Sequence, residues 1–95
     1  MANSVIQPNH MASERIWIPS NGETSYHMHN DRPLWIFISY ASGSTDFEIY
    51  RVTSAGKYLI LGNDNNDIEI SINNQTYYVT FRNHLSWNVK VIILS

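Results

Sequence analysis

Residues 34–38 read Leu-Trp-Ile-Phe-Ile, a run of five apolar side chains with no polar residue between them. Because successive side chains of a β-strand point to opposite faces of its sheet, this run predicts a central strand that is covered on both faces. Residues 68–72 instead alternate apolar and polar side chains, and in residues 87–94 Trp87, Val89, Val91 and Ile93 share one face; both patterns are typical of strands with a buried face. We therefore expect packed sheets built around residues 34–38.

The composition agrees with a β protein. Val, Ile, Thr, Tyr, Phe and Trp supply 34 of the 95 residues, whereas Ala, Leu, Met, Glu, Gln and Lys supply only 20. Turn-forming clusters recur about every 8–12 residues, which is the spacing of a sandwich or barrel. The predicted fold is all-β, a small antiparallel two-sheet β-sandwich or jelly roll of about eight short strands. These strands are expected near 14–19, 24–29, 34–40, 46–53, 57–61, 67–72, 76–82 and 87–94.

The length of the chain allows one domain. Residues 14–95 are expected to form it, and the largely polar residues 1–13 are expected to be a flexible N-terminal arm. The absence of cysteine excludes a disulfide framework and favours a reducing compartment. No apolar run is long enough for a membrane span and no signal peptide precedes the domain, so we expect a protein that is cytoplasmic or released without a classical signal peptide.

An internal repeat is a further possibility. A shift of 52 residues aligns six identical positions, among them Trp35 with Trp87. It also aligns Asn21-Gly22 with Asn73-Asn74, and both pairs suit a type I′ turn between two antiparallel strands. The alignment suggests two related three-stranded halves.

The charge of the chain argues against nucleic acid as a partner. The formal net charge is −2, and the six lysines and arginines are scattered along the chain. Binding to a phosphate backbone needs several cations on one face, so no nucleic-acid partner is expected.

A pair of histidines, His27 and His29, points to one side of a predicted strand, where the two rings could share a metal ion. Together with Gly22, His84 and Asn88 they resemble the two metal motifs of cupins, jelly-roll proteins that hold a metal with His-x-His, a Glu and a distant His. The resemblance implies a transition-metal site at His27, His29 and His84. The chain departs from the cupin pattern because no Glu follows His29 closely. A solvated outer strand face is the competing interpretation, and the internal alignment would instead turn both histidines inward.

Residues 62–67 read Gly-Asn-Asp-Asn-Asn-Asp, with five oxygen-bearing side chains. Calcium takes six to eight oxygen ligands, so the turn from Asn63 to Asp67 is a candidate calcium site. The competing interpretation is a solvated turn, because Asn and Asp are good turn formers.

The aromatic and amide content points to a binding surface. Six tyrosines, three tryptophans and eleven asparagines are the residue types that stack on sugar rings and bond their hydroxyls. The candidate ligand-binding residues are Tyr26, Trp35, Tyr40, Asn63, Asp64, Asn65, Tyr77 and Trp87. The competing interpretation is that most of these rings fill the core.

The sequence thus predicts a non-catalytic, lectin-like module that binds glycans or glycoproteins, as a homo-oligomer because single sugar sites are weak. The alternatives are a protein–protein interaction or assembly subunit and a cupin-like metal-binding protein. No nucleophile motif supports catalysis. General acid–base chemistry by Asp46 and Glu48 stays open, although this pair is expected on a solvated strand face.

Overall fold

The computed structural model describes residues 13–29, 32–40, 47–62 and 66–95. It contains the predicted eight strands, and each strand end lies within two residues of its expected position. The strands are β1 (Ser13–Ile18), β2 (Glu23–His27), β3 (Leu34–Ser39), β4 (Phe47–Thr53), β5 (Gly56–Leu61), β6 (Ile68–Ile72), β7 (Tyr78–Asn83) and β8 (Val89–Leu94). The expected arm lies outside the described residues except for Ser13, which begins β1.

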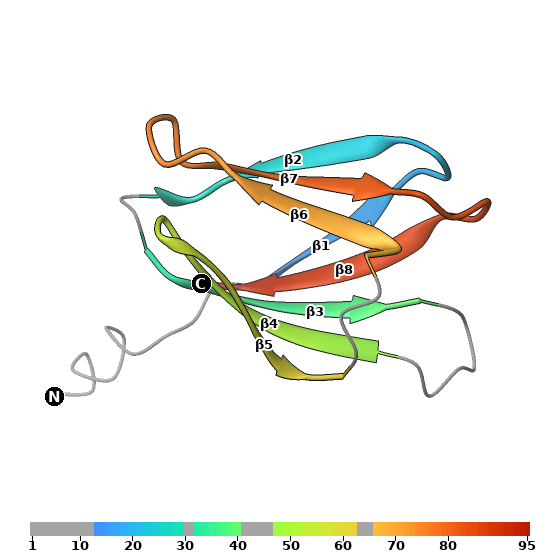
Figure 1. The fold of residues 1–95 in the computed structure, drawn as a ribbon, viewed down its shortest axis with the longest axis horizontal. Helices are drawn as coiled ribbons and strands as arrows, with labels where there is room; N and C mark the ends of the chain where they lie inside the picture. The colour runs from blue at the N-terminus through green and yellow to red at the C-terminus, as the bar shows by residue number, and fades with distance from the viewer. Residues whose placement is uncertain (1–12, 30–31, 41–46, 63–65) are drawn as a thin grey trace, which may run out of the picture.

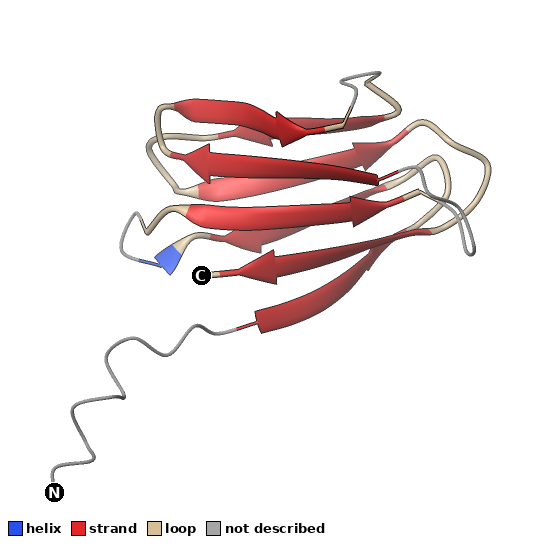
Figure 2. Cartoon of the chain, turned by 90° about the horizontal axis from the view of Figure 1, so that it is seen from below, coloured by secondary structure: helices blue, strands red, loops and turns tan. Residues whose placement is uncertain are grey.

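The strands form two antiparallel sheets that face each other as two layers (Figure 1). One sheet has five strands in the order β1-β8-β3-β4-β5, and the other has three in the order β2-β7-β6. The strands of both sheets run close to the long axis of the molecule (Figure 2). The predicted two-sheet sandwich is confirmed, and β3, which carries the apolar run at residues 34–38, is the central strand of the larger sheet.

The core lies between the two sheets and is built from alternate residues of each strand. On β3, Leu34, Ile36 and Ile38 are buried, and they meet side chains such as Val79 and Phe81 from β7 in one apolar cluster. Burying one side chain of this size stabilises the fold by roughly 1.5–3 kcal/mol relative to leaving it in water. On β6 the alternation in the sequence matches the alternation of buried and exposed residues, whereas β3 is apolar on both sides and its inward side is decided by the packing of the two sheets.

Asn83 is a polar residue inside this core, at the end of β7. Its Nδ2 donates to the carbonyl oxygens of Ile18 at 3.1 Å and Trp87 at 2.8 Å, and its Oδ1 accepts from the backbone N–H of Leu85 at 2.8 Å. One buried amide thereby joins the end of β1 to the loop between β7 and β8, with its own polar atoms satisfied.

The two turns that suggested an internal repeat differ in the structure. Residues 19–22 form a turn in which Gly22 N–H donates to the Pro19 carbonyl at 3.0 Å, but it carries the chain from β1 in the larger sheet to β2 in the smaller one. The turn at Asn73 joins β6 to β7 within one sheet, so only this hairpin is confirmed. Its loop runs from Asn73 to Tyr77, and the predicted type I′ turn is wrong because neither Asn73 nor Asn74 has a positive φ. The predicted hairpin at Asn21-Gly22 is wrong. The two halves of the chain are not structurally equivalent, because the first turn connects strands of different sheets and the second connects neighbouring strands of one sheet.

No helix long and apolar enough to cross a membrane occurs within the described ranges.

Candidate docking surface

The strand register places a continuous set of apolar side chains on the side of the five-stranded sheet that faces away from the core. Leu94 of β8 lies opposite Trp35 of β3, and in the next row Ile92 lies opposite Phe37, which lies opposite Ile49 of β4. We call this side the outer face. Its apolar residues are Trp17, Trp35, Phe37, Phe47, Ile49, Tyr58, Ile60, Leu61, Ile92 and Leu94.

Several of these side chains are largely exposed to solvent. Trp17 on the edge strand β1 is 60% exposed and Tyr58 on the opposite edge strand β5 is 53% exposed, while Phe47, Ile60 and Leu61 are also exposed. The apolar row of Ile92, Phe37, Ile49 and Leu61 is continuous over the four strands β8, β3, β4 and β5, whereas Trp17 on β1 lies opposite Lys90. Single exposed apolar residues are normal, but a contiguous patch over several strands marks an interaction site.

A β-bulge in β5 adds one residue to this surface. Leu59 pairs with Tyr50 and Leu61 pairs with Ile49, which leaves Ile60 as the extra residue between them. Ile60 lines the outer face together with Ile49, so the bulge increases its apolar area.

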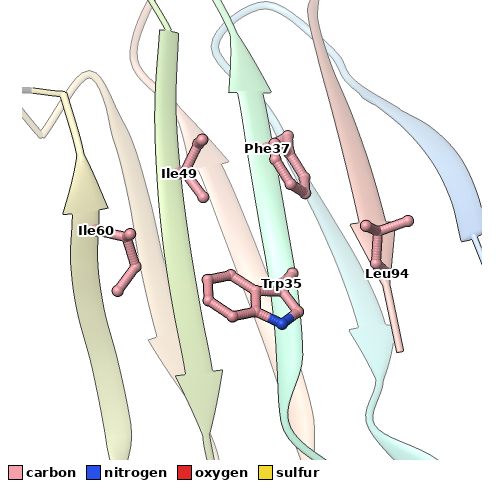
Figure 3. A pocket seen from close by; sticks show the side chains of 5 residues that line it. All are labelled: Trp35, Phe37, Ile49, Ile60 and Leu94. Atoms are coloured by element: carbon pink, nitrogen blue, oxygen red, sulfur yellow. The ribbon is translucent and has the colours of Figure 1, made fainter. Parts of the chain in front are cut away.

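The middle of the outer face is an open hollow of about 360 Å³ lined by Trp35, Phe37, Ile49, Ile60 and Leu94 (Figure 3). The five side chains come from four neighbouring strands, and all of them are apolar apart from the indole N–H of Trp35. Hollows of this composition receive apolar groups of a ligand or partner.

Three charged side chains lie among these apolar residues, and all have one sign. Arg15 on β1, Lys90 on β8 and Arg51 on β4 lie on the outer face, whereas none of its described positions carries a carboxylate. The guanidinium carbon of Arg51 lies 4.6 Å from the centre of the Trp35 ring, a cation–π contact at the border of the hollow. The outer face therefore combines apolar side chains with cations that lie between or beside them.

The solvent side of the three-stranded sheet has the opposite character. Arg82 of β7 pairs with Glu23 of β2 at 2.9 Å, and the hydroxyls of Ser25 and Thr80 bond each other at 3.0 Å across the same strands. Cross-strand polar pairs of this kind are what a sheet exposed to water normally shows. The solvent side of the smaller sheet is thus suited to contact with water, whereas the outer face of the larger sheet is not.

The residues predicted to bind sugars do not gather on one surface. Trp35 lies on the outer face, whereas Tyr40 is buried and Tyr26 and Tyr77 pack against the core. Trp87 is exposed in the loop after β7, where its Nε1 donates to the Tyr40 carbonyl at 2.6 Å. Asn63, Asp64 and Asn65 lie outside the described residues, so the calcium site at this turn stays a prediction.

The three predicted metal ligands are separated. His27 and His29 are exposed with Met28 buried between them, so the solvated-face interpretation is confirmed and the inward register of the repeat alignment is wrong. Their rings meet edge to face with centroids 5.5 Å apart. His84 follows the other end of β7, about 20 Å from the position opposite His27 at roughly 3.3 Å per residue. Its ring bonds Glu69. No group of three metal-binding side chains forms among the described residues.

Glu48 is the residue that the sequence interpretation misplaced. It is only 2% exposed and faces the core from β4, where its Oε1 accepts hydrogen bonds from the hydroxyls of Tyr40 and, at 2.9 Å, Tyr50. Burial, and then the bond to Glu48, raise the pKa of Tyr40 well above its usual range. Glu48 lies in phase with Tyr50 and Val52, so the period-two pattern of β4 was the signal for its inward position. Asp46 lies outside the described residues.

No protein-family model matches the chain, and comparison with curated proteins and with solved structures found no match. The function is therefore argued from the surface itself.

Proposed function

We propose that this protein is a non-catalytic docking module that lies with the outer face of its five-stranded sheet against the surface of a partner. The observation that supports the proposal is the contrast between the two solvent sides of the sandwich. One carries cross-strand polar pairs, whereas the other carries ten apolar side chains and no carboxylate among its described positions. A sheet face of the second kind becomes stable in water when another surface covers it.

The central strand supports the same conclusion from its sequence. The apolar run of β3 predicts cover on both faces, but the described chain covers only the side of Leu34, Ile36 and Ile38. Trp35 and Phe37 on the other side remain partly exposed. The missing layer is what the partner supplies.

The arrangement also resembles the anatomy of known interfaces. Aromatic residues and arginine are enriched at such surfaces, and an apolar centre with a polar border is their usual plan. On the outer face the polar part is supplied by Arg15, Arg51 and Lys90, of which Arg15 lies at an edge of the sheet and the other two lie among the apolar residues. A second copy stacked face to face would bring these cations together without compensating acids, so the partner carries negative charge where this chain carries positive charge.

Recognition of glycans, metal binding and homo-oligomerisation stay predictions. The docking proposal is preferred over the lectin interpretation because Trp35 is the one predicted sugar-stacking ring that belongs to the outer face, while Tyr40 is buried.

Two tyrosines offer a matched test. Tyr58 is 53% exposed on the outer face and Tyr78 is 45% exposed on the solvent side of the smaller sheet. We would replace each in turn with the photoreactive p-benzoylphenylalanine and irradiate the protein in an extract of its source cells with the membranes retained. Adducts of protein or lipid are expected with the probe at position 58 and not at position 78. Equal yields at the two positions, or no adduct at position 58, would overturn the proposal.

A further inference from the structure

We infer that the surface on which the outer face docks is a lipid bilayer that carries anionic headgroups. This inference rests on the proposed docking function and names the partner. It follows from the kinds of side chain on the outer face, from their charge and from the hollow at its centre.

The aromatic residues of the outer face are those that favour the boundary between lipid and water. Trp and Tyr combine an apolar ring with a hydrogen-bonding group, and for this reason they are enriched at the level of lipid headgroups. Trp17 lies on one edge of the sheet, Tyr58 on the other edge and Trp35 in the middle, all on the same side. A broad surface can therefore contact the three rings together.

The charges of the outer face select an anionic surface. Arg15, Arg51 and Lys90 are distributed over three strands, and each cation near an anionic membrane adds to the attraction. The net charge of the whole chain is −2, and acids such as Glu23 and Glu69 lie on the far side of the sandwich. Glu23 is paired there with Arg82, so the excess of cations on the outer face is what orients the domain with this face toward the membrane.

Arg51 and the hollow beside it match the two parts of a phospholipid. The guanidinium group of Arg51 stacks on Trp35 and keeps hydrogen-bond donors available for a phosphate or carboxylate. Directly beside it, Ile49, Ile60 and Leu94 line a space of about 360 Å³ that suits the methylene groups of an acyl chain. Long cationic side chains commonly lie over apolar surface with their charged ends at the headgroups.

A bilayer fits this distribution better than a protein or a nucleic acid. A partner protein would have to place acids at three separate positions among apolar side chains, whereas an anionic bilayer offers headgroups and acyl chains at every position. A nucleic acid would leave Ile49, Ile60 and Leu94 facing phosphates.

The test is co-sedimentation of the full chain with vesicles of phosphatidylcholine alone and of phosphatidylcholine mixed with phosphatidylserine. We expect binding to the mixed vesicles to be tighter by about tenfold or more, and to weaken as salt is added. The emission of Trp17 and Trp35 should shift to shorter wavelength on binding, and Trp17→Phe should reduce that shift.

Matched variants assign the binding to the outer face. Lys90→Glu reverses one charge on the outer face, and Arg82→Glu reverses one charge on the opposite side. We expect Lys90→Glu to weaken binding to the mixed vesicles about tenfold and Arg82→Glu to leave it near the wild-type value. Likewise, Tyr58→Ser should weaken binding to the mixed vesicles, and Tyr78→Ser should leave it near the wild-type value. Circular dichroism verifies that each variant is folded.

Folded wild-type protein that stays in the supernatant with both kinds of vesicle would overturn the inference, as would equal losses in Lys90→Glu and Arg82→Glu. The docking proposal is judged separately by the photoreactive probes. A protein adduct specific to position 58, without vesicle binding, would keep the docking function and replace the bilayer by a protein. The absence of both adducts and vesicle binding would overturn the two proposals together.

Discussion

Tyr50 donates a 2.9 Å hydrogen bond to Oε1 of Glu48, two residues before it on the same strand. The same oxygen accepts the hydroxyl of Tyr40, and the second oxygen of Glu48, which is buried, has no hydrogen-bond partner among the described residues. A carboxyl group held in this way stabilises the fold only while both phenols keep their protons.

The buried phenol of Tyr40 makes stability fall at alkaline pH. Its pKa in the folded protein is raised, so folding favours the protonated form, and this contribution is complete below the usual tyrosine pKa of about 10. As the pH rises above that value, the unfolded chain loses the proton while the folded chain keeps it, and unfolding becomes easier. We expect Tyr40→Phe to lower stability at neutral pH by about 1–3 kcal/mol and to flatten the alkaline loss. Urea unfolding at a series of pH values measures both. An alkaline slope that is the same in wild type and variant would contradict the assignment to Tyr40.

The buried amide of Asn83 is expected to be the most sensitive polar site in the core. Asn83→Ala removes three hydrogen bonds and leaves the Ile18 carbonyl without this donor, for a loss of about 2–4 kcal/mol. Asn88→Ala is the control, because Asn88 is exposed and accepts one bond from Ser20 N–H at 3.1 Å. Asn88→Ala should lower the free energy of unfolding by less than about 1 kcal/mol. Similar midpoints for the two variants in thermal unfolding would show that the Asn83 bonds contribute little.

Two glycines with positive φ separate backbone strain from steric clash. Gly56 has φ 148° and free space around the position of a Cβ, whereas Gly62 has φ 110° and a Cβ there would lie 2.6 Å from the Phe47 carbonyl oxygen. Alanine at either position pays for an unfavourable φ, but only Gly62→Ala also pushes β5 away from β4. We expect Gly62→Ala to be less stable than Gly56→Ala by more than about 1 kcal/mol in chemical unfolding. Equal stabilities of the two variants would show that β5 moves away from β4 at Gly62 without a loss of stability.

The edge strand β5 is expected to promote self-association of the isolated protein. Residues 58–61 read Tyr-Leu-Ile-Leu, are all exposed and carry no charge, and unprotected apolar edges pair with other strands. Ile60→Lys should raise the concentration at which sedimentation velocity detects oligomers, since lysine is a natural blocker of edges. Ser71→Lys on the edge strand β6 is the control and should behave as wild type. Oligomers unaffected by Ile60→Lys would assign self-association to another surface.

Local patterns in the sequence were sufficient to predict where the strands lie but not which strands pair with each other. The apolar run at residues 34–38 and the alternation at residues 68–72 depend on a strand's own two faces, so both could be predicted. Whether Asn21-Gly22 turns within a sheet or between sheets depends on contacts with distant strands, as in the bond from Asn21 N–H to the Leu85 carbonyl at 3.0 Å. No local pattern contains that information.

The candidate site shows the same division. The composition showed a high aromatic content, but which aromatic residues share a surface depends on strand order. Trp17, Trp35 and Tyr58 come together because β1, β3 and β5 lie in one sheet, and β8 and β4 separate them. His27 and His84 resemble parts of one metal motif in the sequence, but they lie at opposite ends of β7 in the structure.

The two-sided apolar character of β3 has a consequence for the life of the protein in a cell. Under the proposed docking function, a copy without its partner leaves Trp35 and Phe37 partly exposed beside the exposed Ile60, and exposed apolar side chains favour recognition by chaperones and proteases. Its abundance should therefore follow the amount of partner surface available, and excess copies should be removed. A single strand thus links the folding of the domain to its turnover.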